Sequence, residues 1–151
     1  MAGQEVKIKS SPDGEFSAYL AAPASGRGPG VVVIQEIFGV NKVMRQVADE
    51  LAARGYFALA PDLFWRLEPG VQLTDKTDEE WKRAFGLMNR FDAALGVKDI
   101  QAAQRLGIRG VFVHTGKHGQ ADLALAAGRR RGGGSPMAEA PSLAAVVAAL
   151  R

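Results

Sequence analysis

Val-Val-Val-Ile-Gln-Glu-Ile-Phe-Gly-Val-Asn, residues 31–41, is the most informative segment of this 151-residue chain. Its first four residues, Val31–Ile34, form an unbroken β-branched run that follows a glycine. Such a run is typical of a strand buried on both faces, as in a parallel sheet covered by helices. Glu36 comes just after this strand, at the carboxyl edge where open α/β sheets bind their ligands. Glu36 is therefore a candidate functional residue.

A helix and a second strand are predicted directly downstream. Apolar residues recur at spacings of three and four between Asn41 and Arg54, which predicts an amphipathic helix. Asn41 suits the N-cap of this helix, and Gly55 suits the position after its C-cap. Tyr56–Ala60 is a short apolar segment typical of a second strand. Strand, helix and strand together predict a βαβ unit and an α/β fold.

The flanking regions complete this prediction. Glu5–Lys9 and Glu15–Ala21 alternate polar and apolar residues around the turn sequence Ser11–Gly14, which predicts an antiparallel hairpin. Farther along, we expect an irregular stretch at Leu63–Thr77. Two helices are expected after it, at Asp78–Phe91 and Lys98–Leu106, with a break between them at Asp92–Val97.

The composition changes near residue 106. Residues 1–106 carry a net charge of −1, and residues 107–151 carry +4. Ala, Gly, Arg and Pro account for 37 of the first 106 residues but 25 of the last 45. We expect residues 1–106 to be part of one domain and 107–151 to be an unrelated tail, either disordered or read from a shifted frame. Within the tail, Val111–Val113 is a possible short strand, and 121–127 and 143–150 are possible helices.

Three segments resemble the N-terminal half of the dienelactone hydrolase family. They are the 31–41 segment, Ala-Asp-Glu-Leu-Ala-Ala-Arg-Gly-Tyr at 48–56 and Ala-Pro-Asp-Leu-Phe-Trp-Arg at 60–66. The resemblance runs from about Val6 to about Arg105. It implies an α/β-hydrolase fold, present here only as its N-terminal βαβ half with helices. It also implies a Cys-His-Asp triad that cleaves lactones or esters.

The resemblance assigns two catalytic positions. Glu36 matches the family's carboxylate that contacts the resting thiol, and the Ile37 amide matches half of the oxyanion hole. Spacing alone favours a structural role for Glu36, either pairing with a nearby arginine or capping the following helix.

Other family positions fall on the helix predicted over Asp78–Phe91. Lys82 or Arg83 lies near the position that binds a substrate carboxylate, and neither is assigned. Phe85 and Met88 lie where the family shapes its pocket. Packing or solvation is the alternative for all four residues.

The nucleophile of this chemistry is missing. The chain has no cysteine and no Gly-x-Ser-x-Gly motif, and the family's strained strand-to-helix elbow is not found. We therefore predict a catalytically inactive chain of hydrolase lineage; the alternative is a non-catalytic fragment that binds a small molecule or acts through its basic tail. A frameshift between about Leu106 and Asp122 would explain the tail, because the shifted codons of residues 123–128 permit Cys-Leu-Gly-Gly-Arg.

Weaker signals favour ordinary structural roles. His114 and His118 have a metal-binding spacing, but Gly116 between them indicates incidental loop histidines. Arg129–Arg131 could contact phosphates or be a solvated linker. We expect Ser142 to be an N-cap, whereas Asp62 could form a turn or bind a ligand.

The expected partner is a small lactone or ester, with no cofactor and no metal. Neither a nucleic acid nor a membrane is expected as a partner. Met1–Ser10 is polar, which predicts no signal peptide and a cytoplasmic location. Half of an α/β-hydrolase sheet would leave an apolar strand at its edge, so we also predict poor solubility.

Overall fold

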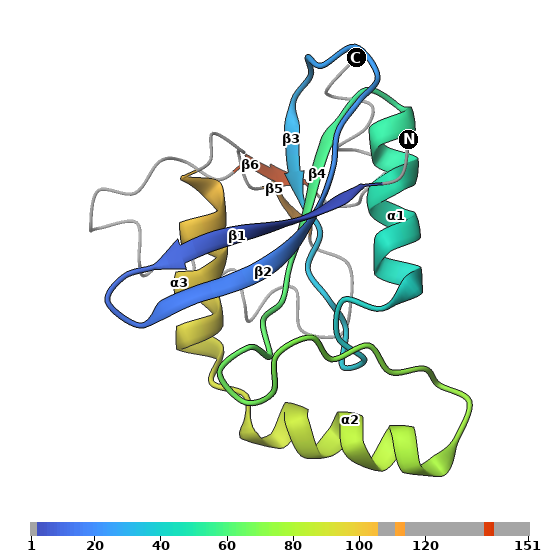
Figure 1. The fold of residues 1–151 in the computed structure, drawn as a ribbon, viewed down its shortest axis with the longest axis vertical. Coiled ribbons are helices and arrows are strands. Elements are labelled where there is room, and N and C mark those ends of the chain that lie inside the picture. Colours follow the sequence, from blue (N-terminus) through green and yellow to red (C-terminus); the bar gives the residue numbers. More distant parts are fainter. Residues whose placement is uncertain (1–2, 106–110, 114–137, 141–151) are drawn as a thin grey trace. The chain divides into compact units, whose positions relative to one another are not determined.

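The computed structural model describes residues 3–105, 111–113 and 138–140, and the chain divides into two compact units, Met1–Ile108 and Arg109–Arg151. The strands of the first unit form one sheet in the order β1-β2-β4-β3 (Figure 1). They are β1 (Gln4–Ser10), β2 (Gly14–Ala21), β3 (Gly30–Val32) and β4 (Phe57–Pro61). Its helices are α1 (Lys42–Ala53), α2 (Asp78–Arg90) and α3 (Ala93–Gln104). The predicted α/β class is confirmed.

Both predicted pairings within the sheet are present. β1 and β2 form the antiparallel hairpin, with Val6 opposite Ala18. β3 pairs in parallel with β4 and is joined to it through α1, which confirms the βαβ unit. The strand predicted over Val31–Ile34 is wrong at its end, because β3 stops at Val32 and Ile34 is 49% exposed.

α1 and α3 pack on opposite faces of the sheet. Alternate residues of a strand point to opposite faces, and β3 shows this directly. Val31 and Val33 belong to the apolar cluster that includes Leu51 of α1, whereas Val32 belongs to the cluster that includes Ala103 of α3. The continuous apolar run at 31–33 is thus explained by burial on both faces.

The helix ends follow from local side-chain chemistry. The Asn41 side chain accepts hydrogen bonds from the amides of Val43 and Met44, which confirms it as the N-cap of α1. Gly55 follows the C-cap of α1 with a φ of 96°, a conformation that glycine adopts without strain.

The break predicted at Asp92–Val97 is wrong, because α3 already begins at Ala93. Asp92 is the N-cap of α3, and its side chain accepts from the amides of Ala94 and Leu95. The ring of Phe91 packs against Gly96 of this helix, which leaves no space for a side chain at that position. A Cβ atom at residue 96 would come within 2.4 Å of the Phe91 ring.

In the second unit, β5 (Val111–Val113) pairs in parallel with β6 (Ala138–Ala140). The strand predicted at 111–113 is confirmed, whereas β6 was not predicted. The other features predicted in the tail lie outside the described residues: the helices over 121–127 and 143–150, His114, His118, Arg129–Arg131 and Ser142. Within the described part of the chain, every helix is too short or too polar to cross a membrane.

Candidate active site

The loop that carries Glu36 and Ile37 follows β3 and is fixed at both ends. At its start, the Gln35 side-chain oxygen accepts a hydrogen bond from the Leu63 amide at 2.9 Å, which ties the loop to the segment after β4. At its end, the Phe38 carbonyl accepts from the Leu73 amide at 2.9 Å. Residues 35–38 are therefore held at the carboxyl edge of two neighbouring parallel strands.

Gly39 is required at the end of this loop. Its φ is 78°, which side chains other than glycine rarely adopt. A Cβ atom at this position would lie 2.0 Å from the Val71 carbonyl oxygen. The loop can approach the 71–73 segment this closely only because residue 39 has no side chain.

Glu36 lies exposed in this loop and makes no ion pair with any residue that the structure describes. The following helix is capped by Asn41 instead. Neither structural alternative, an arginine partner or a capping role, is thus found among the described residues. The Glu36 carboxylate therefore lies at the carboxyl edge of the sheet without a described ion-pair partner.

The Ile37 amide, like those of Glu36 and Phe38, has no hydrogen-bond acceptor among the described residues, whereas the carbonyls of Glu36 and Phe38 accept from the amides of Gly39 and Leu73. The Ile37 side chain packs with Phe38 against an apolar cluster that includes Phe64, Val71 and Leu87. The side chain therefore anchors this residue, and its N–H remains unused.

Helix α2 adds an aromatic wall beside this loop. Trp81 contacts Phe38 edge-on, with ring centroids 4.9 Å apart, and stacks on Phe85 at 5.6 Å. Phe85 and Met88 are 47% and 48% exposed. The exposed Phe85 and Met88 side chains could contact an apolar ligand bound near Ile37, which belongs to the same unit.

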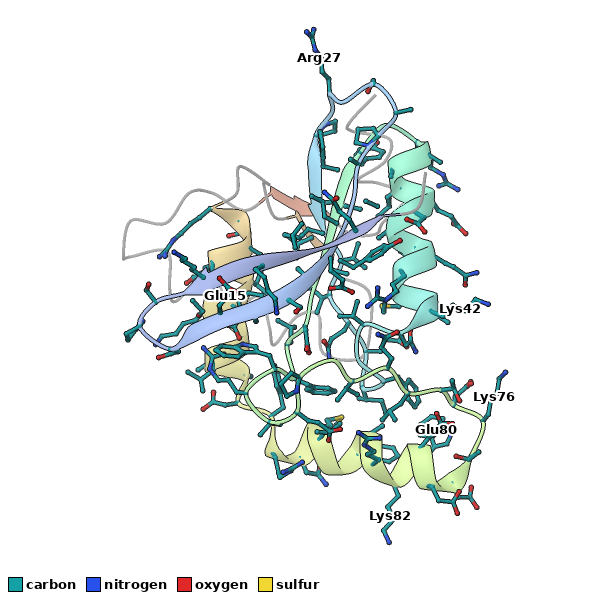
Figure 2. The ribbon with its side chains drawn as sticks, viewed as in Figure 1. Glu15, Arg27, Lys42, Lys76, Glu80 and Lys82 are labelled. Carbon is teal, nitrogen blue, oxygen red and sulfur yellow. The ribbon has the colours of Figure 1, made fainter. Side chains whose placement is uncertain are left out.

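The two basic residues considered on α2 differ in their surroundings. Lys82 extends away from the rest of the unit (Figure 2). Arg83 forms an ion pair with Glu68. Neither is brought against Glu36 or Ile37 by a described contact.

Asp62 has the turn role that was one of its two predicted roles. The residue is 5% exposed, and its carboxylate accepts from the amides of Phe64 at 3.0 Å and Gly70 at 2.7 Å. Burial raises the pKa of Asp62 above its ordinary value, against the opposite effect of these two hydrogen bonds. A cavity of about 150 Å³ beside Asp62 is also lined by Tyr19 and Arg45, but not by Glu36 or Ile37.

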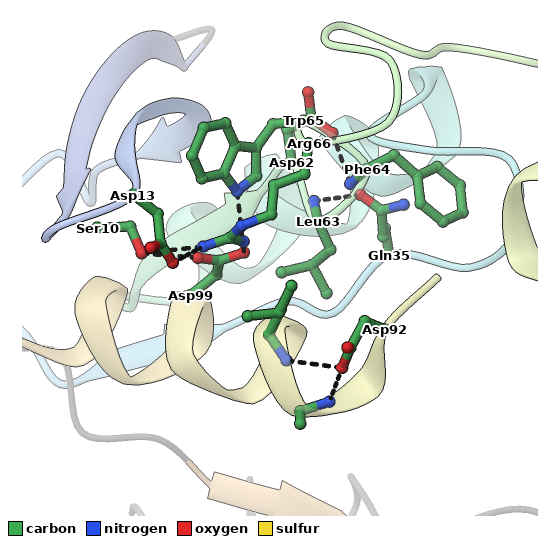
Figure 3. A network of polar contacts seen from close by, with 12 residues as sticks. Ser10, Asp13, Gln35, Asp62, Leu63, Phe64, Trp65, Arg66, Asp92 and Asp99 are labelled. Carbon is green, nitrogen blue, oxygen red and sulfur yellow. Dashed lines mark hydrogen bonds and ion pairs between the residues drawn. The ribbon is translucent and has the colours of Figure 1, made fainter. Parts of the chain in front are cut away.

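A buried polar network was missed by sequence reasoning (Figure 3). Asp99 of α3 is fully buried and accepts from the Ser10 hydroxyl and the Trp65 indole N–H, each at 2.9 Å. Arg66 pairs with Asp99 and, at 2.8 Å, with Asp13. Burial lowers the pKa of Arg66, but the bonds to Asp99 and Asp13 outweigh it and the pKa is raised.

No sequence signal marks this network, because its members lie far apart in the chain. It joins the β1–β2 turn, the loop after β4 and helix α3. It therefore holds the first unit together on the α3 face of the sheet rather than shaping the Glu36 loop. In the described ranges, no group of three or more acidic or histidine side chains could hold a metal ion.

Comparison with known proteins agrees with this fold. The family model described as "Dienelactone hydrolase family" matches residues 16–109. A model described as HAD-hydrolase-like matches the shorter stretch 97–132, most of which lies outside the described residues.

The chain is 63% identical over 89 residues to a protein of Azospirillum brasilense named "Putative carboxymethylenebutenolidase", covering 58% of this chain and 38% of that protein. It is 40% identical over 102 residues to the carboxymethylenebutenolidase of Pseudomonas sp. strain P51, covering 68% of this chain and 43% of that protein.

Solved structures share the fold at lower sequence identity. The structure of a protein of Klebsiella pneumoniae named "Putative Dienelactone Hydrolase" aligns with a TM-score of 0.54 and 25% identity, covering 74% of this chain and 50% of the other. A dienelactone hydrolase from Anabaena variabilis, at 20% identity and a TM-score of 0.51, shows the same fold. The chain spans about two fifths of the length of the curated relatives it matches. The family match covers more than half of the chain, so this chain belongs to the dienelactone hydrolase family.

Proposed function

We propose that this chain carries one part of the active site of a carboxylic ester or lactone hydrolase and is itself inactive. In this proposal, the Ile37 amide is one donor of the oxyanion hole. The Glu36 carboxylate is the group that faces the attacking thiol. The nucleophile, acid and base of the reaction are not supplied by this chain.

The unused Ile37 amide is the observation that carries the proposal. Its residue is anchored by packing, lies at the carboxyl edge of two parallel strands and has no acceptor among the described residues. An N–H group held in this way can stabilise the negative charge that develops on a carbonyl oxygen during acyl transfer. The exposed Glu36 carboxylate precedes it by one residue.

The inactivity follows from the chemistry. Acyl transfer of this kind needs a nucleophile activated by a base, and the chain contains no cysteine. A carboxylate and one oxyanion donor do not replace that nucleophile. The small lactone or ester is thus a ligand class proposed for the complete site.

The inactivity is tested with p-nitrophenyl acetate and dienelactone as substrates of the purified 151-residue protein. We expect no hydrolysis above the buffer rate. Turnover that Glu36→Ala abolishes and Glu50→Ala leaves unchanged would refute this part of the proposal. Glu50 is a suitable control because it is also an exposed glutamate, on α1.

The partial site is tested in a chimera. The stretch of the A. brasilense protein that matches this chain is replaced by the corresponding residues of this chain. We expect the chimera to hydrolyse dienelactone and Glu36→Ala to reduce kcat while Glu50→Ala does not. A folded chimera whose activity is insensitive to Glu36→Ala would contradict the role given to Glu36.

We also propose that residues 107–151 are read from a shifted frame and do not belong to the hydrolase domain. The change of composition near residue 106 supports this, as does the family match that ends at residue 109. Sequencing of the gene tests it. A shifted frame around codons 118–130 that encodes no cysteine elbow rejects the frameshift.

A further inference from the structure

Strand β3 is an edge of the four-stranded sheet. It pairs with β4 on one side, and no described strand pairs with it on the other (Figure 1). An unpaired edge presents a row of backbone N–H and C=O groups that can bind another strand.

The register of β3 identifies which groups face this free edge. The Val33 amide donates to the Leu59 carbonyl, and the Phe57 amide donates to the Pro29 carbonyl, each at 2.8 Å. In a parallel ladder, hydrogen bonds to one neighbour use alternate residues. The backbone groups of Gly30 and Val32 and the Ile34 amide therefore point away from β4.

Val32 is the central member of this row. Its side chain packs in the cluster that includes Ala103 of α3, and its backbone groups that point away from β4 meet no partner among the described residues. A strand that pairs with this edge would satisfy these groups.

The edge also lacks the features that prevent strand addition. Residues 28–34 read Gly-Pro-Gly-Val-Val-Val-Ile and carry no charge. The ring of Pro29 does not block the free edge, because Pro29 belongs to the set of alternate residues that faces β4. Natural edge strands commonly carry a charge or a proline on the free side, and β3 has neither.

We propose that this edge binds the β3 edge of a second copy of the chain, antiparallel and about a two-fold axis through Val32. In this register, Val32 of each copy exchanges both backbone hydrogen bonds with Val32 of the other. Gly30 of one copy then lies opposite Ile34 of the other.

The proposed register also covers an exposed side chain. Ile34 is 49% exposed, and residues directly opposite one another share a face of the sheet. Gly30 has no side chain, so Ile34 of one copy has room to lie across Gly30 of the second copy. The two sheets would join into one, and the contact would close on itself as a dimer.

Sedimentation velocity over a range of protein concentrations tests this proposal. We expect a monomer–dimer equilibrium that Ile34→Lys and Val32→Pro each weaken by at least about tenfold, an effect of about 1.4 kcal/mol. Val43→Lys is the matched control, because Val43 is a similarly exposed apolar residue, at 56%, on α1 rather than at the edge. Circular dichroism establishes that each variant is folded.

Amide exchange measured by NMR gives a second readout that does not depend on a variant. The Val31 and Val33 amides should be protected at every concentration, since they face β4. The Val32 and Ile34 amides should become protected only as the dimer forms.

Three results would overturn the proposal. They are a monomer at all concentrations, a dimer that both edge variants leave intact, and protection of the Val32 amide in the monomer, which would mean that the chain's own residues fill the edge. Growth into larger oligomers instead of a dimer would contradict the closed two-fold register.

Discussion

Replacing Asp99 by alanine should remove a large part of the stability of the first unit. Asp99 is fully buried and accepts hydrogen bonds from Ser10, Trp65 and Arg66. Truncation would leave the Ser10 hydroxyl, which is also buried, and the Trp65 indole N–H without this acceptor. It would also leave the Arg66 guanidinium without its more buried partner.

The expected loss is about 3 kcal/mol. Removing one partner of a buried ion pair typically costs about 3–5 kcal/mol, because the other charge stays uncompensated. Arg66 keeps Asp13 at 2.8 Å and its side chain is 20% exposed, which places the expectation at the lower end. The shape-conserving Asp99→Asn should cost about 1–2 kcal/mol, because an amide oxygen can still accept but the charge is lost.

Urea unfolding followed by tryptophan fluorescence measures these losses. The chain has two tryptophans, so a Trp81→Phe background makes the signal report on Trp65, which lies in the network itself. With a slope of about 1–3 kcal/mol per molar urea, a loss of about 3 kcal/mol moves the midpoint by roughly 1–3 M. Asp75→Ala is the control, at an exposed loop carboxylate, and should change stability by less than about 0.5 kcal/mol.

A loss below about 1 kcal/mol for Asp99→Ala, with unchanged Trp65 emission, would refute this reasoning. It would mean that water replaces the carboxylate at low cost and that the network does not hold α3 to the hairpin.

Three further outcomes follow from the described contacts. Gly39→Ala should destabilise the fold by about 2 kcal/mol or more in urea unfolding, because of its positive φ and the clash with Val71; Gly26→Ala, at a positive φ in open space, should cost only about 1 kcal/mol. Asn41→Ala should cost about 1 kcal/mol in the same measurement through loss of the α1 N-cap, and a loss near zero would contradict that role. Burial raises the pKa of Asp62 above its ordinary 3.8, so its stabilising contribution is present at low pH and lost as the pH rises through the raised pKa. The stability of the wild type relative to Asp62→Asn should therefore fall as the pH rises above about 3.8, and a stability that increases with pH would contradict this expectation.

Local patterns were sufficient to predict most elements of the first unit. The spacing of apolar residues, with Asn41 before it and Gly55 after it, predicted α1 to within a residue or two. The alternation around the 11–14 turn predicted the hairpin and its antiparallel pairing. These features depend on neighbours in the sequence, which is why the sequence revealed them.

The errors have tertiary causes. The start of α3 was misplaced, because Gly96 disfavours a helix by itself but in the fold makes room for the Phe91 ring. The end of β3 was misplaced because apolarity continues through Ile34. The chain leaves the strand there, and Gln35 reaches the Leu63 amide.

The candidate site was predicted only in part. Glu36 and Ile37 could be singled out by their place after a buried strand and by family resemblance, and their catalytic roles remain predictions. The contacts that fix their loop could not be foreseen, because Leu63, Val71 and Leu73 lie tens of residues away. An even longer separation, of 89 positions, hid Asp99 as the partner of Ser10.

The bond between Ser10 and Asp99 spans 89 positions of the chain, which sets an order of events during synthesis. The hairpin that contains Ser10 leaves the ribosome early, but its anchor emerges only with α3. Contacts between such distant residues form slowly, because a long loop must first be closed. In a nascent chain stalled before codon 99, β1 and β2 should therefore lack the hydrogen bond from Ser10 to Asp99. They should stay accessible to proteases and chaperones until α3 has been synthesised.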